Sequence, residues 1–304
     1  MKILEIKNIS KTFASIKAVD NISFEINQGD VLGLLGPNGA GKTTTIRMIM
    51  NIIIPDSGEV ILSNQTKKAN SSLIGYLPEE RGIYRKMKVV NVLKFLAILK
   101  DMDKKIATQE IDYWLHRLNL MEWKHKKIEE LSKGMQQKLQ FIATILHKPK
   151  LLILDEPFLG LDPINTNLIK EIILEEKAKG TTIIFSTHQM ESAEKLCNKI
   201  ILINKGQKVL EGTISDVKNS FSKHHIHLEY DGDNQFLEDE KIAKYDDFGN
   251  YVEIQLKQDI DPQDFLREIV TKLKIRKFEI KEPSLNEIFI DTVNNMNLEV
   301  DDEK

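Results

Sequence analysis

The chain has 304 residues, of which 41% are hydrophobic and 29% are charged, so it can form a core in about two domains and is not mainly disordered. Its one cysteine, Cys197, excludes an intramolecular disulfide framework. The longest segments without Asp, Glu, Lys or Arg, 31–41 and 180–190, have 11 residues, whereas a membrane-spanning helix needs about 20 apolar ones. Early charged residues also argue against a signal peptide, so we expect a soluble intracellular protein.

The charge is distributed unevenly. Residues 215–304 contain 12 Lys and Arg against 22 Asp and Glu, whereas the first 214 residues contain 31 against 24. A mildly basic body suits a phosphate-bearing ligand, and an acidic tail argues against nucleic acid as a partner. Two ordinary solvated surfaces would give the same balance, so charge alone does not decide between these interpretations.

The sequence of the first part of the chain predicts strands followed by a glycine-rich loop and a helix. Residues 3–6 and 22–26 alternate apolar and polar side chains, as half-buried strands do. Residues 31–35 form an apolar run, which is typical of a buried parallel strand. A glycine-rich loop comes next, and then an expected helix over 44–53 that Pro55 stops.

The middle of the chain predicts a helical insertion and then more of the same sheet. Residues 89–147 have mainly helical spacing of apolar side chains. Strand character returns at 151–154 and 182–185, with a helix expected over 164–179 between them, and residues 200–203 begin a further strand. Alternating strands and helices indicate an α/β sheet with a helical subdomain.

The composition changes after about Ser215, and a small α+β domain is expected there. Residues 225–230 and 251–256 alternate as strands. A helix is expected over 264–273, a strand over 275–280 and a last helix from Ser284.

The segment between the buried strand at 31–35 and the next helix fits the pattern G-x-x-x-x-G-K-[ST]. Glycines allow successive backbone N–H groups to face one point, and the N-terminus of the helix adds positive dipole. Lys42 would reach the β- and γ-phosphates, and the Thr43 hydroxyl would ligate Mg²⁺. The expected phosphate contacts are Gly36, Pro37, Asn38, Gly39, Ala40, Gly41, Lys42, Thr43 and Thr44.

Two adjacent acids end the apolar strand at 151–154. Consecutive side chains of a strand point apart, so Asp155 and Glu156 are expected to do different work. Together with the phosphate loop, this arrangement favours Asp155 as a magnesium ligand and Glu156 as the base that polarises the attacking water. On its own, the pair would be read as a solvated strand end.

The segment Leu131-Ser132-Lys133-Gly134-Met135 predicts the start of a helix, with Ser132 as its N-cap. Backbone N–H groups at such a start can bind an anion, so Ser132 and Gly134 are candidates for contact with a γ-phosphate.

These motifs, in this order, resemble the nucleotide-binding subunit of ABC transporters over about residues 1–215. The resemblance implies that Phe13 stacks on adenine and that His188 senses the γ-phosphate. It also implies that Leu161-Asp162 contacts a second copy across a head-to-tail dimer. In that dimer each ATP touches the phosphate loop of one copy and the Leu-Ser-x-Gly segment, here Ser132 and Gly134, of the other.

Two segments depart from the pattern of the family. Lys133 and Met135 replace a glycine and a glutamine, while Gly134 is kept. Glu79 stands where the family commonly has a glutamine; a carboxylate can still ligate Mg²⁺ but cannot donate a hydrogen bond. We therefore expect Glu79 to act at the metal and in catalysis. Coupling to the rest of the transporter through the loop that contains Glu79 is expected to differ in detail but not in kind.

The resemblance implies an ABC-type P-loop ATPase domain over 1–214, with a helical subdomain at about 79–147, and an accessory domain over 215–304. It implies ATP and Mg²⁺ as cofactors. A second copy or a related ATPase and a separate multispanning permease would be the partners, docked at about Glu79 to Leu99 on the cytoplasmic face of the cell membrane. Together with Pro283 to Ile290, Tyr76 to Tyr84 looks like the ATPase of ABC-2-type exporters for sodium or drugs.

Two other functions are weighed against a transport motor. A soluble ABC ATPase acting in assembly or regulation resembles the first domain alone and leaves the second unexplained. A nucleotide-binding regulator without chemistry is disfavoured because Lys42, Asp155, Glu156 and His188 are all present.

Overall fold

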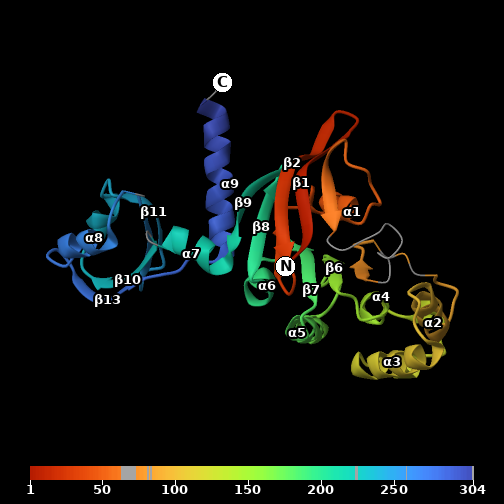
Figure 1. Cartoon of the computed structure of the whole chain (residues 1–304). Coiled ribbons are helices and arrows are strands. Elements are labelled where there is room, and N and C mark those ends of the chain that lie inside the picture. The colour runs from red at the N-terminus through yellow and green to blue at the C-terminus, as the bar shows by residue number, and fades with distance from the viewer. Residues whose placement is uncertain (63–72, 81, 83, 223–224, 258, 303–304) are drawn as a thin grey trace. The chain divides into compact units, whose positions relative to one another are not determined.

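The computed structural model describes residues 1–62, 73–80, 82, 84–222, 225–257 and 259–302. Two compact units divide the chain, Met1–Glu211 and Gly212–Lys304, and each is described by itself (Figure 1).

A six-stranded sheet forms the centre of the first unit, with strand order β5-β6-β7-β3-β8-β9. The first five strands in this order pair in parallel. Every residue of β3, β6 and β7 is buried, as expected of parallel strands that are covered on both faces. The bounds are β3 (Val31–Leu35), β5 (Ile74–Leu77), β6 (Leu151–Asp155), β7 (Thr182–Thr187), β8 (Lys199–Asn204) and β9 (Gln207–Thr213).

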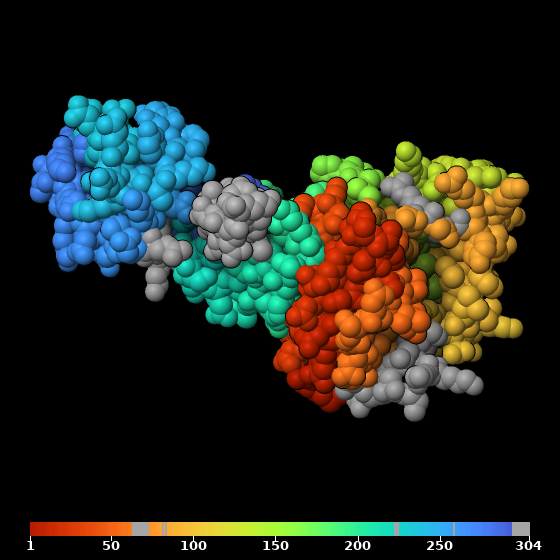
Figure 2. Space-filling view, turned by 90° about the horizontal axis from the view of Figure 1, so that it is seen from above, coloured from red at the N-terminus to blue at the C-terminus, as the bar shows by residue number. Residues whose placement is uncertain are grey.

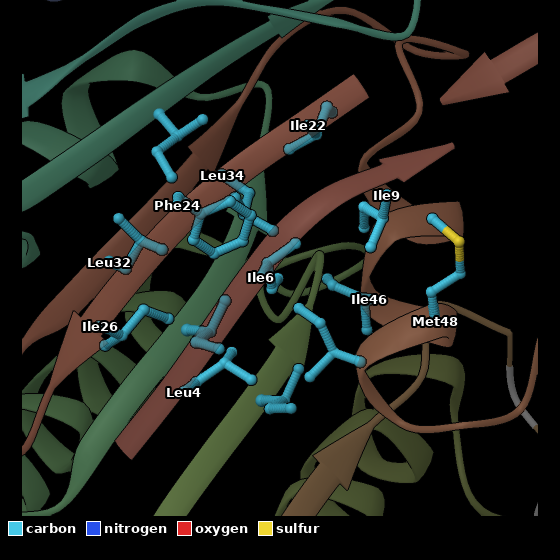
Figure 3. Packing of buried hydrophobic residues seen from close by; sticks show 14 of the residues in the cluster. Leu4, Ile6, Ile9, Ile22, Phe24, Ile26, Leu32, Leu34, Ile46 and Met48 are labelled. Atoms are coloured by element: carbon cyan, nitrogen blue, oxygen red, sulfur yellow. The ribbon is translucent and has the colours of Figure 1, made fainter. Parts of the chain in front are cut away.

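An antiparallel sheet of order β2-β1-β4 packs against this centre. Its strands are β1 (Lys2–Phe13), β2 (Ile16–Asn27) and β4 (Ser57–Leu62), and β1 and β2 form an outer surface of the unit (Figure 2, red). Alternate residues of β1 and β2 point inward, where they meet Leu32 and Leu34 of β3 and Ile46 of the first helix (Figure 3). The core of the first unit therefore fixes the strand that precedes the glycine-rich loop.

Helices connect the strands of the central sheet. The helix after the glycine-rich loop, α1 (Lys42–Ile49), starts directly after Gly41, two residues earlier than expected. It also ends earlier than expected, because Asn51 adopts a left-handed conformation with φ 54° before Pro55 is reached. The helical segment contains α2 (Val89–Leu99), α3 (Lys104–Arg117) and α4 (Lys133–Ile145), with short turns η1 (Met121–Trp123) and η2 (Ile128–Glu130). The remaining helices are α5 (Pro163–Ala178) and α6 (Met190–Leu196).

The second unit contains an antiparallel sheet of order β11-β12-β10-β13. Ile226 pairs with Ile254, and their inward side chains join Phe265 and Ile269 of the helix α8 in a separate core. Sequence patterning missed β11, whose residues are mostly polar and exposed. The bounds are α7 (Ile214–Ser222), β10 (His225–Asp231), η3 (Asn234–Glu238), β11 (Ile242–Asp247), β12 (Val252–Leu256), α8 (Pro262–Ile269), β13 (Lys274–Ile280) and α9 (Leu285–Asp302).

Within the described residues, no helix combines the length and apolar character that a membrane span requires.

A half-buried histidine, His147, ties the helical segment to the edge of the central sheet. Nε2 of His147 lies 3.2 Å from the carbonyl oxygen of Ile74, which also accepts from Nζ of Lys100 at 3.1 Å. Because a carbonyl oxygen can only accept, the neutral ring of His147 donates to it from Nε2. The other ring nitrogen, Nδ1, is buried and has no hydrogen-bond partner among the described residues. Burial, with the nearby charge of Lys100, lowers the pKa of His147 from 6.5 to about 4.

The pKa shift predicts an acid-sensitive contribution to stability. The folded protein binds the proton more weakly than the unfolded chain, so the contribution is present above pH 6.5 and is lost as the pH falls through about 4. Discounted for partial exposure, it should be about 1–2 kcal/mol. Urea titrations between pH 7 and 4.5 should show a shallower loss of unfolding free energy in His147→Gln than in wild type. The exposed His116→Gln should follow wild type, and parallel curves for all three proteins would refute the assignment.

Candidate functional site

The glycine-rich loop joins β3 to α1 and requires glycine at two positions. A Cβ on Gly36 would lie 2.1 Å from the carbonyl oxygen of Ile203, and one on Gly41 would lie 2.4 Å from that of Ala18. Both glycines have positive φ, 145° and 108°. The N-terminus of α1 has no side-chain cap, so its free N–H groups are available to an anion.

Lys42 lies over the loop at the first position of α1. Its ammonium donates to the carbonyl oxygens of Gly36 at 2.8 Å and Pro37 at 2.9 Å, and the residue is 6% exposed. Burial lowers the pKa of Lys42, and the carboxylates of Glu156, Asp155 and Glu79 oppose that shift. The ammonium is thus held beside the loop by neutral acceptors that a phosphate could replace.

The other candidate residues follow the ends of neighbouring parallel strands. β5, β6, β7 and β3 are adjacent and parallel in the sheet, so their carboxyl ends lie at one edge. This edge carries Glu79, Asp155, Glu156 and His188, and the loop follows the fourth strand. A hollow of about 170 Å³ lies there, lined by Ala18, Asn38, Gly39, Ala40, Gly41, Lys42, Thr43, Thr44, Glu79 and Glu156.

Asp155 is completely buried at the end of β6. Its Oδ1 accepts hydrogen bonds from the hydroxyls of Ser186 and, at 3.2 Å, Thr43. Its Oδ2 is one of the buried side-chain atoms that lack a partner among the described residues. Burial raises the pKa of Asp155, and the nearby Glu79 and Glu156 add to the effect. A buried carboxylate oxygen without a partner is energetically unfavourable, and a bound cation would stabilise it.

The oxygens around Asp155 fit a magnesium ion bound together with phosphates. Oγ1 of Thr43 lies 3.5 Å from Oε2 of Glu79, so hydroxyl and carboxylate oxygens lie together. In the described part of the chain no group of three or more His, Cys, Asp or Glu side chains could hold a metal by itself. Mg²⁺ commonly uses one or two carboxylates, with substrate phosphates and waters as the other ligands, and this donor set matches that habit.

Glu156 is held in a left-handed backbone conformation, with φ 48°, immediately after β6. Its N–H is bonded at 3.2 Å to both the hydroxyl and the carbonyl oxygen of Ser186. One oxygen of its carboxylate, Oε1, lies 2.9 Å from Nδ1 of His188. The side chain of Glu156 is 10% exposed and that of His188 is 44% exposed, so the pair runs from the core to the surface. Glu156 lines the hollow and His188 does not, so contact of His188 with the γ-phosphate stays a prediction.

Other predicted residues lie outside this hollow. Phe13 ends β1 with 45% exposure and is not among the lining residues, so its contact with adenine stays a prediction. Ser132 caps α4 by accepting from the N–H of Met135 at 3.3 Å, and Asp162 caps α5 by accepting from that of Asn165 at 2.9 Å. Gly134 lies in the first turn of α4, beside the carbonyl of Gly160.

Sequence reasoning missed two residues that shape the site. Ala18 lines the hollow from β2, which its small apolar side chain does not signal. Ser186 contacts both acids, but only the pairing of Asp155 with Ser186 between β6 and β7 reveals this.

Known proteins that resemble this chain carry the same kind of nucleotide-binding domain. Residues 19–159 match the model of the ABC transporter family, and residues 212–293 match that of the ATP-binding protein DrrA1-3-like C-terminal domain. The ABC transporter ATP-binding protein YhaQ of Bacillus subtilis (strain 168) is 44% identical over 95% of this chain and 98% of its own length. The chain belongs to the ABC transporter ATP-binding proteins.

Two further relatives extend the comparison of this ABC ATPase. The linearmycin resistance ATP-binding protein LnrL of Bacillus subtilis (strain 168) is 32% identical over 94% of this chain and 97% of its own length. The solved ATP-binding subunit of an ABC transporter superimposes with a TM-score of 0.67 at 29% identity, over 72% of this chain and 93% of that one. The expected α/β P-loop fold of ABC type is confirmed, and the protein is an ATP hydrolase that serves a transporter.

Proposed function

We propose that this ABC ATPase is the motor of an exporter and drives a separate membrane-spanning permease by ATP-dependent dimer closure. The likeness to the resistance protein LnrL, which spans nearly the whole of both chains, supports export as the direction. The match of residues 212–293 to a DrrA1-3-like domain supports the same branch. The protein would act at the cytoplasmic face of the cell membrane.

The hollow beside the glycine-rich loop is not lined by Ser132 or Gly134 of the same chain, which favours a head-to-tail dimer. One chain supplies the loop, Glu79 and Glu156 to its hollow, while Ser132 and Gly134 start α4 outside it. A second copy could present its own Ser132 and Gly134 to the γ-phosphate, with Asp162 near the seam. Closure would then require nucleotide in the interface, because the phosphates bridge N–H groups of two chains.

The roles of the residues follow from their positions around the hollow. Lys42 and the loop would bind the β- and γ-phosphates, and Thr43, Asp155 and Glu79 would hold Mg²⁺. When bound, that ion neutralises charge that develops on the transferred phosphoryl group. Glu156 would accept the proton of the attacking water, and His188 would hold Glu156 and contact the γ-phosphate.

An exposed apolar surface on the helical segment is the proposed docking site of the permease. The ring of Tyr84 meets that of Phe95 edge to face at 6.0 Å, and the two residues are 58% and 40% exposed. Ile98 and Leu99 on α2 are also exposed, by 52% and 57%. Apolar side chains gathered in this way are typical of an interaction surface.

Membrane recovery tests the proposal. The tagged chain, expressed in its own cells, should sediment with membranes and co-purify with a multispanning polypeptide. Phe95→Asp should release it into the supernatant, because a buried interface would then contain an unpaired charge. Ile106→Asp, on the 51% exposed side chain in α3, should stay with the membranes. ATP binding by each variant serves as the check on folding.

If the wild-type chain stays in the supernatant, alone or with soluble proteins, the exporter assignment falls. The alternative of a soluble ABC ATPase in assembly or regulation would then replace it.

A further inference from the structure

We propose that Ser186 is a positioning residue whose single hydroxyl orients both acids of the site, the side chain of Asp155 and the backbone of Glu156. This inference rests on the proposed roles of Asp155 at magnesium and of Glu156 as the base. It predicts that the strength of magnesium binding and the rate of hydrolysis depend on one hydroxyl that touches neither the ion nor ATP.

The sheet brings Ser186 to both acids. Asp155 at the end of β6 pairs in register with Ser186 of β7, and Ser186 is completely buried. Its hydroxyl donates to Oδ1 of Asp155 and accepts from the N–H of Glu156 at 3.2 Å. A hydroxyl can donate one hydrogen bond while accepting others, so one side chain can serve both acids at once.

The hydrogen bond to Asp155 sets how its carboxylate is turned. Oδ1 accepts from Ser186 and Thr43, whereas buried Oδ2 lacks a partner among the described residues. Thr43 is itself expected to ligate magnesium through a lone pair, which leaves its O–H free to donate to Oδ1. Ser186 is the second donor to Oδ1 and the one that does not touch the ion, so it helps to keep Oδ1 engaged and to leave Oδ2 for the ion, as outer partners of metal ligands do.

The hydrogen bond to Glu156 supports an unfavourable backbone. Residues other than glycine seldom adopt φ 48°, so contacts must hold Glu156 there. The hydroxyl and the carbonyl oxygen of Ser186 share its N–H. Without the hydroxyl, the carbonyl of Ser186 would be the one acceptor left to this N–H, and the turn that aims the carboxylate toward His188 would be less firmly held.

The test separates magnesium binding from nucleotide binding. Titration of a fluorescent ATP analogue should give the same affinity for wild type and Ser186→Ala in EDTA, because the phosphate loop is intact. The Mg²⁺ concentration that half-saturates the gain in affinity should rise about 10-fold in Ser186→Ala, and turnover should fall about 10- to 100-fold. Ser186→Thr, which keeps the hydroxyl on a strand that tolerates β-branching, should restore both.

A matched control separates this effect from a general loss of stability. Thr182 is also completely buried, lies at the other end of β7, and its hydroxyl accepts from the N–H of Gly29 at 3.0 Å. Thr182→Val removes that hydroxyl and should leave the Mg²⁺ dependence unchanged.

Three results would overturn the proposal for Ser186. These are an unchanged Mg²⁺ dependence in Ser186→Ala, an equal change in Thr182→Val, or a loss of nucleotide affinity in EDTA that matches the loss with Mg²⁺. Asp155→Asn and Glu156→Gln test the underlying roles separately. If both lose hydrolysis while Ser186→Ala does not, only this inference fails. If both hydrolyse ATP normally, the proposed function of the site fails instead.

Discussion

Glu156→Gln should reduce steady-state ATP hydrolysis by about 10²- to 10⁴-fold while ATP binding is retained. The amide has the size of the carboxylate, and its oxygen can still accept from Nδ1 of His188, which lies 2.9 Å from Oε1. The backbone N–H remains bonded to Ser186, so the turn at φ 48° keeps its supports. What the amide cannot do is take a proton from the attacking water.

Because binding continues and hydrolysis stops, the variant should accumulate in an ATP-bound state. With Mg²⁺ and ATP, light scattering after size-exclusion chromatography should show a dimer that wild type forms only transiently, and phosphate release should be nearly absent. Glu171→Gln, an exposed position on α5, is the matched control and should hydrolyse ATP as wild type does. Normal turnover by Glu156→Gln would show that Glu156 is not the base.

The sequence predicted β3, β6, β7 and β8 of the central sheet, because burial leaves a strong signal, but it named neither β5 nor β9. The continuous apolar runs before Gly36 and Asp155 could be read directly as β3 and β6. The polar strand β11 carried no such signal, because its stability comes from pairing with β12 rather than from its own side chains. The early end of α1 depends on the left-handed Asn51, which local propensity did not reveal.

The site was predictable where one segment carries its chemistry and unpredictable where strands meet. Lys42 and Thr43 are adjacent to the glycines that define their loop, so spacing alone was enough to propose them as phosphate and magnesium contacts. Ser186 acquires its role only because β7 lies beside β6 in a register that sets it against Asp155. The pairing of His188 with Glu156 likewise depends on that strand order, since the two residues are 32 positions apart.

Lys42→Ala should weaken ATP binding by about 10²- to 10⁴-fold, since hydrogen bonds to a charged group are worth about 1.5–3 kcal/mol each and an ammonium can make two to the phosphates. The ammonium donates to the carbonyls of Gly36 and Pro37, at 2.8 and 2.9 Å. Both carbonyls belong to the loop that borders the hollow, so the ammonium needs to move only locally to meet a phosphate.

Loss of binding in Lys42→Ala should not come from unfolding. Burial lowers the pKa of Lys42, so the folded protein holds this charge at a cost. Its removal gives up the two hydrogen bonds to the loop but also this cost, so the melting temperature should change little. Equilibrium titration with a fluorescent ATP analogue, alongside thermal melts, measures both effects. The exposed Lys105→Ala on α3 should bind as wild type does. Wild-type affinity in Lys42→Ala would refute the assignment of the loop as the phosphate site, whereas weak binding with an intact melt would locate the loss in the phosphate contact itself.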